Sequence, residues 1–223
     1  MNIKDQFVHF LVEAGALKFG DFVTKSGRNT PYFINTGEFR TGATLSKLAE
    51  YYASTYMVHF DGKAQNLYGP AYKGIPLCAA TAMKLSDVYD QNLTFTYNRK
   101  EVKDHGDTGI MLGSSLKDGD RVVMIEDVTT SGKSIEETFP ILKAQGDVQI
   151  KGLVVSLNRM EKGKGEKSAL AEISELYGFP ATAIVTMAEV TEYLYGKEIG
   201  GSVLIDDERK AAIDAYYKEY GAK

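Results

Sequence analysis

Two adjacent carboxylates, followed by hydroxyl side chains and a glycine, form the segment of this sequence with the clearest chemical potential. The segment reads EDVTTSGKS and covers residues 126–134. Glu126 and Asp127 can accept hydrogen bonds from the 2′- and 3′-hydroxyls of a ribose, and the hydroxyls and helix N-terminal amides after them can donate to a phosphate. The same residues could merely cap a helix. Two acids together with a TTSG loop exceed what capping requires, so we favour a sugar-phosphate site.

A P-loop is a second interpretation of this segment. Gly132, Lys133 and Ser134 match the end of the pattern G-x-x-x-x-G-K followed by Ser or Thr, but the first position of that pattern falls on Asp127. Two carboxylates at the mouth of a polyphosphate cradle would also oppose the charge of the ligand. A P-loop nucleotide hydrolase or kinase is therefore the weaker interpretation.

A glycine-containing segment, YGPAYKGIP, occupies residues 68–76. Gly69 and Gly74 let the backbone approach a ligand closely, and Pro76 suits the first turn of a helix. Free backbone N–H groups beside Lys73 could hold a phosphate or a pyrophosphate. A purely structural turn into a helix would have the same sequence features, so both interpretations stay open.

Basic residues are concentrated in the segment YNRKEVKDHGDTGIMLG, residues 97–113. Arg99, Lys100, Lys103 and His105 are four potential cations within seven residues, and three glycines follow them. Such a run is often only a solvated surface. Its position between a strand end and a glycine-rich stretch instead predicts a mobile lid that brings positive charge to an anionic transition state.

Alternating helices and strands must position these segments. The apolar periodicity predicts helices at residues 2–18, about 43–60, 75–85, 133–145, 168–177 and 206–220, and strands at 66–69, 93–98, 121–126, 150–157 and 182–187. Residues 22–35 read as a hairpin-like excursion around a Ser-Gly-Arg-Asn turn. Short apolar strands separated by helices are typical of an α/β fold with a largely parallel sheet. Ligands bind beyond the carboxyl ends of such strands, so the loops that follow the strands are the expected site.

The composition limits the class of protein. The chain has 223 residues and no internal linker, which fits one large domain. It carries 26 Lys and Arg against 30 Asp and Glu, a formal charge of -4 that argues against a protein coating nucleic acid but allows a local basic patch. The single cysteine, Cys78, excludes an internal disulfide and fits a reducing cytosol. With no secretion signal and no apolar run of about 18 residues, we expect a soluble, cytoplasmic protein without a membrane partner.

Several segments together resemble the orotate phosphoribosyltransferases, a branch of the type I phosphoribosyltransferases. Residues 126–134 look like the motif that binds 5-phosphoribosyl diphosphate (PRPP) in that family. The resemblance becomes more specific with KSGRNTPYFIN (25–35), GPAYKGIP (69–76), NRKEVKDHG (98–106) and SLNRMEKG (156–163). It spans residues from about 18 to 170.

This resemblance implies an α/β fold of the type I phosphoribosyltransferase kind, with a central, mainly parallel sheet flanked by helices. Residues 1–223 would form a single domain, with a core at about residues 41–205 and a small hood made of about residues 1–40 and the C-terminal helix. The implied reaction transfers the 5-phosphoribosyl group of PRPP to N1 of orotate and yields orotidine 5′-monophosphate and pyrophosphate, with Mg²⁺ present. A homodimer whose lid residues are shared between subunits is also implied.

Roles for individual residues come from the same resemblance. The catalytic residues would be Lys73, Lys103 and Asp127. PRPP would contact Lys25, Tyr72, Lys73, Arg99, Lys100, Lys103, His105, Glu126, Asp127, Val128, Thr129, Thr130, Ser131, Gly132, Lys133 and Ser134. Orotate would contact Phe33, Ile34, Thr130 and Arg159, although hydrophobic core is the alternative for the YFI run. The guanidinium of Arg159 can hold the substrate carboxylate through two parallel hydrogen bonds. No protein ligand for the metal is implied, because PRPP oxygens would carry Mg²⁺.

Three positions depart from the family pattern. Glu126 stands where an aspartate is usual, and its extra methylene shifts the reach of the carboxylate. Ser131 and Lys133 stand where small residues are common; Lys133 could add charge near the 5-phosphate or pair with Glu137 one helical turn on. A PRPP-binding regulator without activity is the alternative for the whole chain, but the retained basic segment favours an enzyme.

Overall fold

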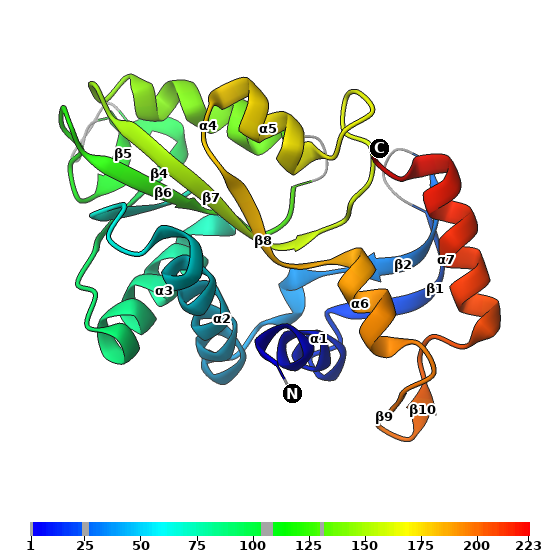
Figure 1. Ribbon diagram of the computed structural model, residues 1–223. Helices are drawn as coiled ribbons and strands as arrows, with labels where there is room; N and C mark the ends of the chain where they lie inside the picture. Colours follow the sequence, from blue (N-terminus) through cyan, green and yellow to red (C-terminus); the bar gives the residue numbers. More distant parts are fainter. Residues whose placement is uncertain (1, 24–26, 104–108, 130–131) are drawn as a thin grey trace.

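A central sheet organises the molecule (Figure 1). The computed structural model describes residues 2–23, 27–103, 109–129 and 132–223, except the side chains of residues 102 and 103. Within these residues the sheet has six strands: β3 (Asn66–Gly69), β4 (Thr94–Lys103), β5 (Gly109–Gly113), β6 (Arg121–Ile125), β7 (Gln149–Asn158) and β8 (Ala181–Thr186). They lie in the order β5-β4-β3-β6-β7-β8, and neighbours are parallel except β4 and β5. The predicted α/β fold with a mainly parallel sheet is confirmed.

Helices cover both faces of this sheet. One face carries α2 (Gly42–Phe60) and α3 (Gly74–Tyr89), and the other carries α4 (Lys133–Lys143) and α5 (Ala169–Tyr177) (Figure 1). Successive side chains of β6 point to opposite faces of the sheet, because side chains alternate along a strand. Val123 and Ile125 join the hydrophobic core that includes residues of α2 and α3, whereas Val122 and Met124 join the core that includes residues of α4 and α5. Burial on both faces explains the continuous apolar run in this strand.

A smaller group of elements comes from the two ends of the chain. It comprises α1 (Ile3–Glu13), β1 (Leu17–Val23), β2 (Asn29–Ile34), the short 3-10 helix η1 (Thr36–Glu38), α6 (Met187–Leu194), β9 (Glu198–Ile199), β10 (Ser202–Val203) and α7 (Asp207–Tyr220). β1 and β2 pair antiparallel, which confirms the predicted hairpin. In Figure 1, α7 lies beside this hairpin, so the last helix of the chain covers one of its first elements.

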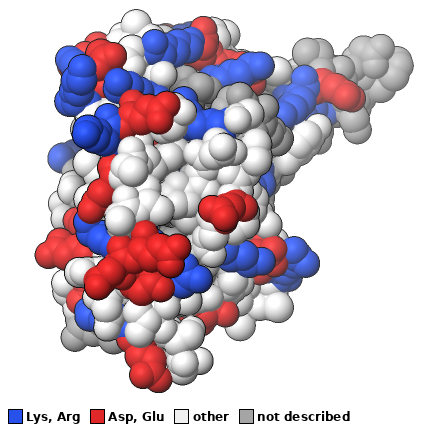
Figure 2. Space-filling view, turned by 90° about the vertical axis from the view of Figure 1, so that its right-hand side faces the viewer, with Lys and Arg blue, Asp and Glu red and all other residues white. Residues whose placement is uncertain are grey.

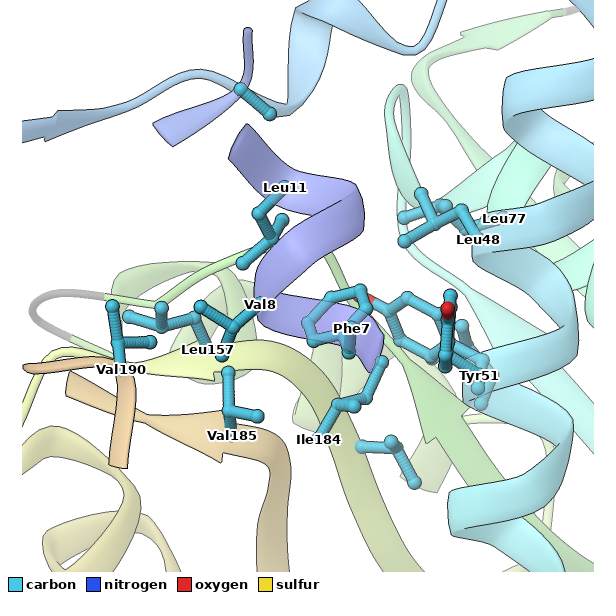
Figure 3. Packing of buried hydrophobic residues seen from close by; sticks show 14 of the residues in the cluster. Phe7, Val8, Leu11, Leu48, Tyr51, Leu77, Leu157, Ile184, Val185 and Val190 are labelled. Carbon is cyan, nitrogen blue, oxygen red and sulfur yellow. The ribbon is translucent and has the colours of Figure 1, made fainter. Parts of the chain in front are cut away.

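Apolar side chains of α1 join this group to the main core (Figure 3). The ring of Phe7 lies 4.9 Å from the ring of Tyr51 in α2. Figure 3 places Val8 near Leu157 and Val185 of the sheet. The N-terminal helix therefore packs on the same core as the sheet, and the hairpin that follows it is held close to the ends of the central strands.

The first helix is shorter than its apolar spacing predicts. The spacing continues to residue 18, but α1 ends at Glu13 and β1 begins at Leu17. Gly15 has a φ of 68°, the left-handed conformation that commonly terminates a helix. The backbone therefore turns there, although the hydrophobic pattern does not change. Apart from this helix and β4, the predicted elements match the structure to within a few residues; β5, α6, β9 and β10 were not predicted.

The basic segment is a strand where the sequence indicates a loop. β4 was expected to end at residue 98 but continues to Lys103, because β5 pairs with it antiparallel at residues 96–98 and again at Lys103↔Gly109, with a register shift between Asn98 and Lys103. β3 pairs with β4 only along residues 94–97. The remainder of β4 thus leaves the sheet with β5 as a two-stranded ribbon. A Cβ at Gly113 would lie 2.5 Å from the carbonyl oxygen of Phe95, so this close pairing requires glycine.

Charges of both signs are mixed on the face that carries α7. Figure 2 shows Lys and Arg side chains interspersed with Asp and Glu side chains there. This distribution agrees with the near balance of 26 basic and 30 acidic residues. None of the helices in the described ranges combines the length and the apolar character that a membrane span requires.

Candidate active site

The Glu126–Asp127 pair directly follows β6, and two buried hydroxyl groups hold its backbone. Tyr52 of α2 donates a hydrogen bond to the carbonyl oxygen of Glu126 at 2.7 Å, and Ser156 of β7 donates to that of Asp127 at 2.8 Å. Tyr52 and Ser156 are fully buried. Buried hydroxyls must find partners, so these bonds persist and fix the carbonyl groups where β6 ends. Both carboxylates therefore start from a firmly held backbone.

Asp127 forms an ion pair with the loop that follows β3. Nζ of Lys73 lies 3.0 Å from Oδ2 of Asp127, and the hydroxyl of Thr36 donates to the same oxygen at 2.6 Å. Oδ1 of Asp127 is buried and has no hydrogen-bond partner among the described residues. The structure thus brings together two of the predicted catalytic residues, and a ligand hydroxyl or cation could satisfy the remaining carboxylate oxygen.

Glu126 is buried and turns toward the start of α4. Its Oε1 accepts a hydrogen bond from the N–H of Asp127 at 2.9 Å. Burial raises the pKa of this carboxyl, and the hydrogen bond from Asp127 and the nearby hydroxyl of Ser134, in the first turn of α4, offset only part of that effect. Asp127 instead contacts Lys73 and Thr36, so helix capping does not account for the pair of acids as a whole.

The start of α4 is shaped by a glycine and a threonine. Gly132 has a φ of 71°, which favours glycine, and its N–H donates to the hydroxyl of Thr129 at 3.0 Å. Lys133 is exposed, and its ammonium lies 3.8 Å from Glu137. Of the two roles predicted for Lys133, this contact agrees with pairing to Glu137. The N–H groups of the first turn of α4 remain the expected phosphate-binding groups of this segment.

Asn98 connects the loop after β3 to β4. Its Oδ1 accepts hydrogen bonds from the hydroxyl of Tyr68 at 2.8 Å and from the N–H of Ala71 at 3.0 Å, and Asn98 itself is buried. The peptide bond between Ala71 and Tyr72 is cis. The hydrogen bonds fix the backbone just before Lys73, so its ammonium group comes from a loop of defined conformation.

Gly69 and Gly74 allow this loop to pack closely within the protein. A Cβ at Gly69 would lie 2.3 Å from the carbonyl oxygen of Gly74 and 2.5 Å from Cβ of Cys78. A Cβ at Gly74 would lie 2.7 Å from Cδ of Pro70 and 3.1 Å from the carbonyl oxygen of Ile125. Both glycines therefore meet a structural requirement. A further role of their N–H groups toward a ligand stays a prediction.

Arg99 and Lys100 lie where β4 leaves the sheet. Nζ of Lys100 lies 5.3 Å from the centre of the Tyr72 ring, within the range of a cation–π contact. The Tyr72 residue is 63% exposed. A cavity of about 280 Å³ adjoins these segments, and Ala71, Arg99 and Ser134 are among its lining residues. Three of the segments predicted to bind PRPP thus surround one cavity.

Arg159 follows β7 and already holds a carboxylate of the protein. Its Nε and Nη2 donate to Oε1 of Glu161 at 3.0 and 2.6 Å. Its guanidinium carbon lies 4.6 Å from the centre of the Tyr32 ring. Tyr217 of α7 donates to the carbonyl oxygen of Arg159 at 2.6 Å. The predicted ligand of the orotate carboxylate is therefore held between the hairpin and the last helix.

Phe33 and Ile34 point to opposite sides of the hairpin, as successive residues of a strand do. Phe33 is exposed, and its ring lies 5.5 Å from the ring of Phe22. Ile34 packs against the main core. Phe33 is thus available to a flat ligand ring, whereas Ile34 takes the position expected from the hydrophobic-core alternative.

Some predicted site residues lie outside the described part of the chain, namely Lys25, His105, Thr130 and Ser131. Lys103 is the last residue of β4, and its side chain also lies outside the described part of the structure. Val128 is half-buried between Asp127 and Thr129.

The structure adds four residues to the site that the sequence analysis did not single out: Thr36, Tyr52, Glu161 and Tyr217. Thr36 and Glu161 have a weak sequence signal, because they adjoin or fall within the segments that carry the family resemblance. The two tyrosines have none, since each is one of fourteen in the chain and acts through a contact with a distant segment.

The fold and the site define a class of protein. Two acids at the end of a buried parallel strand, a helix N-terminus after them and cations on the neighbouring loops suit a ligand with both hydroxyl and phosphate groups. In agreement, residues 39–181 match the family model for the phosphoribosyl transferase domain.

Relatives over the whole chain narrow this class. The chain is 60% identical over 220 residues to an orotate phosphoribosyltransferase of Clostridium botulinum (strain Eklund 17B / Type B), covering 99% of this chain and 98% of the relative. It is 61% identical, with the same coverage, to an orotate phosphoribosyltransferase of Lachnoclostridium phytofermentans. The crystal structure of orotate phosphoribosyltransferase from Francisella tularensis superposes with a TM-score of 0.84 at 36% identity, covering 97% of this chain and 100% of the other. The chain therefore belongs to the orotate phosphoribosyltransferase family, as its motifs predict.

Proposed function

We propose that this chain transfers the 5-phosphoribosyl group of PRPP to N1 of orotate, which yields orotidine 5′-monophosphate and pyrophosphate. The observation that carries the proposal is the Lys73–Asp127 pair, 3.0 Å apart at the end of β6, in a chain that belongs to this family. In the reaction the bond between ribose C1 and the pyrophosphate oxygen breaks, a bond from C1 to N1 of orotate forms, and the N1–H bond breaks, with its proton passing to the leaving pyrophosphate or to water. Pyrophosphate leaves with the electron pair, so positive character grows on the ribose while negative charge grows on the leaving group.

The two carboxylates suit the ribose of PRPP. Oδ1 of Asp127, which has no hydrogen-bond partner in the described ranges, can accept a hydrogen bond from one ribose hydroxyl, and Glu126 lies beside it for the other. Residues 128–134 at the start of α4 would hold the 5-phosphate through N–H and hydroxyl groups. This assignment explains why two acids that would repel a phosphate stand directly before a helix N-terminus.

Lys73 supplies positive charge for the leaving group. Its side chain is 62% exposed while its ammonium contacts Asp127, so it can turn toward a bound pyrophosphate without crossing the protein interior. Pyrophosphate would then replace Asp127 as the anionic partner of Lys73, and a ribose hydroxyl would replace Lys73 as the partner of Asp127. The exchange gives the pyrophosphate a cationic partner and leaves the carboxylate of Asp127 hydrogen-bonded.

The ribbon formed by β4 and β5 would complete the charge around pyrophosphate. Arg99, Lys100, Lys103 and His105 are proposed to close over PRPP, together with Tyr72 and with Lys25 from the hairpin. Support comes from the contact of Lys100 with Tyr72 and from the shared cavity at Arg99. We further propose a homodimer in which these basic residues reach the active site of the second copy.

The donor groups of the site fit Mg²⁺ that is carried by the substrate. Mg²⁺ prefers oxygen ligands, keeps several waters and commonly binds substrate phosphates with only one or two carboxylates. The pyrophosphate oxygens of PRPP would be such ligands, while Oδ1 of Asp127, which has no partner among the described residues, stays assigned to the ribose. Among the described residues, no three His, Cys, Asp or Glu side chains are placed to hold a metal by themselves. When bound, the ion would neutralise negative charge on the pyrophosphate.

Orotate would lie against the hairpin. Phe33 offers an exposed ring for stacking, and the guanidinium of Arg159 can bind the carboxylate of orotate. Ile34 and Thr130 are the remaining proposed contacts. The proposed hood, about residues 1–40 with α7, and the proposed core, about residues 41–205, would then enclose the nucleobase between them. The single cysteine supports a reducing, cytoplasmic setting.

A direct assay tests the proposed function. Purified protein is mixed with Mg²⁺, PRPP and orotate, and the absorbance of orotate is followed. We expect orotate to be consumed only when PRPP and Mg²⁺ are both present, and a metal chelator to stop the reaction. Folded protein that consumes no orotate under these conditions would refute the proposal.

A further inference from the structure

A buried cluster of charged and phenolic side chains surrounds Glu161, which no proposed step has used so far. Its side chain is only 10% exposed. Arg159 donates two hydrogen bonds to its Oε1, the hydroxyl of Tyr32 donates to the same oxygen at 2.6 Å, and Nη1 of Arg28 lies 3.3 Å from Oε2. Glu161 thus joins the turn of the hairpin to the loop after β7.

Glu161 occupies one edge of the Arg159 guanidinium. Nε and Nη2 point to Oε1 of Glu161, at 3.0 and 2.6 Å. A guanidinium group is planar and carries five N–H donors, so the edge formed by Nη1 and Nη2 faces a different direction. That second edge can donate two parallel hydrogen bonds to a substrate carboxylate. The contact with Glu161 therefore sets the direction in which Arg159 presents its second edge.

Charge and packing reinforce this arrangement. Arg28, Arg159 and Glu161 carry two positive charges and one negative charge, a local excess that suits a single substrate carboxylate. The ring of Tyr32 supports Arg159 from one side, at 4.6 Å from the guanidinium carbon. An arginine fixed in this way loses little conformational freedom when it binds its ligand.

We infer that Glu161 is a positioning residue, which orients Arg159 toward the substrate carboxylate and thereby makes the site prefer orotate over an uncharged pyrimidine of the same shape. The inference rests on the proposed function, because Arg159 is the proposed ligand of orotate. Glu161 itself does not touch the substrate in this arrangement; its effect passes through Arg159 and, by way of Arg28, through the hairpin turn.

Binding selectivity tests the inference. Equilibrium binding of orotate and of its uncharged carboxamide is measured by calorimetry, with wild-type protein and with Glu161→Gln. We expect the wild type to prefer orotate and Glu161→Gln to lose about tenfold of that preference, since hydrogen bonds to charged groups contribute strongly. Glu161→Asp keeps the charge and should restore part of the preference. A purely structural role would weaken both ligands equally, and an unchanged ratio in a folded variant would overturn the inference.

Controls separate the possible causes. Glu166→Gln removes an exposed carboxylate of the same loop, 2.9 Å from Lys223, and should leave the ratio unchanged. If Glu161→Gln does not fold, Tyr32→Phe decides, because it removes one hydrogen bond to Glu161, together with the bond between the Tyr32 and Tyr217 hydroxyls, and should lower the preference by about threefold; an unchanged ratio there overturns the inference. Turnover with PRPP is measured separately. Wild-type protein that selects orotate but forms no product would refute the proposed function and leave the inference on Glu161 standing.

Discussion

Asp127 holds two partners on a single carboxylate oxygen. Lys73 and Thr36 both approach Oδ2, at 3.0 and 2.6 Å, while Oδ1 is buried without a partner in the described chain. A carboxylate that is half satisfied in this way retains a strong tendency to accept one more hydrogen bond. The proposed role of Asp127 therefore depends on the negative charge of its carboxylate, and a neutral side chain of the same shape would not replace it.

Replacing that charge tests the role of Asp127. We expect Asp127→Asn to lower kcat/KM for PRPP by about 10²–10³-fold, because an amide accepts weakly and cannot hold Lys73 ready for the leaving group. Steady-state kinetics with varied PRPP give the measurement. Asp214→Asn, an exposed acid of α7 that pairs with Lys210, is the matched control and should leave kcat/KM unchanged. A loss of less than about threefold in Asp127→Asn would contradict the assigned role.

The raised pKa of Glu126 predicts how stability depends on pH. A carboxyl group whose pKa is higher in the folded chain contributes its stability fully below its unfolded value, near 4.5, and loses it as the pH rises through the folded-state pKa. We therefore expect Glu126→Gln, which cannot ionise, to unfold at a higher temperature than the wild type at about pH 7 and at a similar temperature at about pH 4. Thermal unfolding across this range checks the sign, and a variant less stable than the wild type near neutral pH would contradict it.

Among the elements, the loop between β3 and α3 depends on two glycines. A Cβ at Gly74 would lie within 2.7 Å of Pro70, whereas a Cβ at Gly42, at the start of α2, would meet nothing within 4 Å. We expect Gly74→Ala to destabilise the protein by about 1–3 kcal/mol through overpacking, and Gly42→Ala to be tolerated. Thermal or urea unfolding of the two variants makes the comparison. Equal stability of the two variants would show that the loop can relax around a methyl group.

The order of elements could be predicted from the sequence because each central strand and helix buries one continuous apolar surface. The run of β6 and the helix at α2 illustrate this, since their residues meet the core where periodicity places them. The predicted first helix was longer than α1. The helix ends because of the backbone conformation at Gly15, which the hydrophobic pattern does not reveal. β5 was not predicted, since its pairing with the basic segment lies outside the local pattern.

The motifs of the candidate site could be predicted from the sequence, but the hydrogen bonds between its distant residues could not. Carboxylates, glycines and basic residues carry their chemistry in their type and spacing, so Asp127 and Lys73 could be selected from the sequence alone. Tyr52 and Tyr217 act on the site through hydrogen bonds to residues that are 74 and 58 positions away in the sequence. Such contacts arise from tertiary packing, which no single sequence displays.

At the scale of the whole molecule, the acidic total charge gives little information about the site. The formal charge of -4 is spread over 223 residues, whereas the predicted cations of the site lie in a few short segments, at Lys25, Lys73, residues 99–105, Lys133 and Arg159. The charge near the site therefore indicates which ligand binds. The mixed positive and negative surface in Figure 2 gives no information about the ligand.

The proposed sharing of lid residues between two copies has a specific test. Lys103→Ala and Asp127→Asn are each expected to be nearly inactive, because each removes a charge from a different proposed part of the site. If the lid acts on the second subunit, mixed dimers contain one intact site, and re-associated equal mixtures should recover about a quarter of wild-type activity. The separately purified variants serve as controls. No recovery in mixtures shown to exchange subunits would place the lid on its own subunit's site.

The unequal lengths of β3 and β4 also predict a difference in the rate of amide hydrogen exchange along β4. Thr96 and Tyr97 of β4 are paired with strands on both sides, whereas Asn98 and Lys103 are paired only with β5, and the register is interrupted between these two residues. Amide hydrogens on the outer part should therefore exchange with deuterium faster than those of residues 94–97, without unfolding of the sheet. Mass spectrometry of the exchanged peptides would show this boundary at Asn98. A ribbon that opens separately from the sheet would let PRPP enter and pyrophosphate leave while the core stays folded.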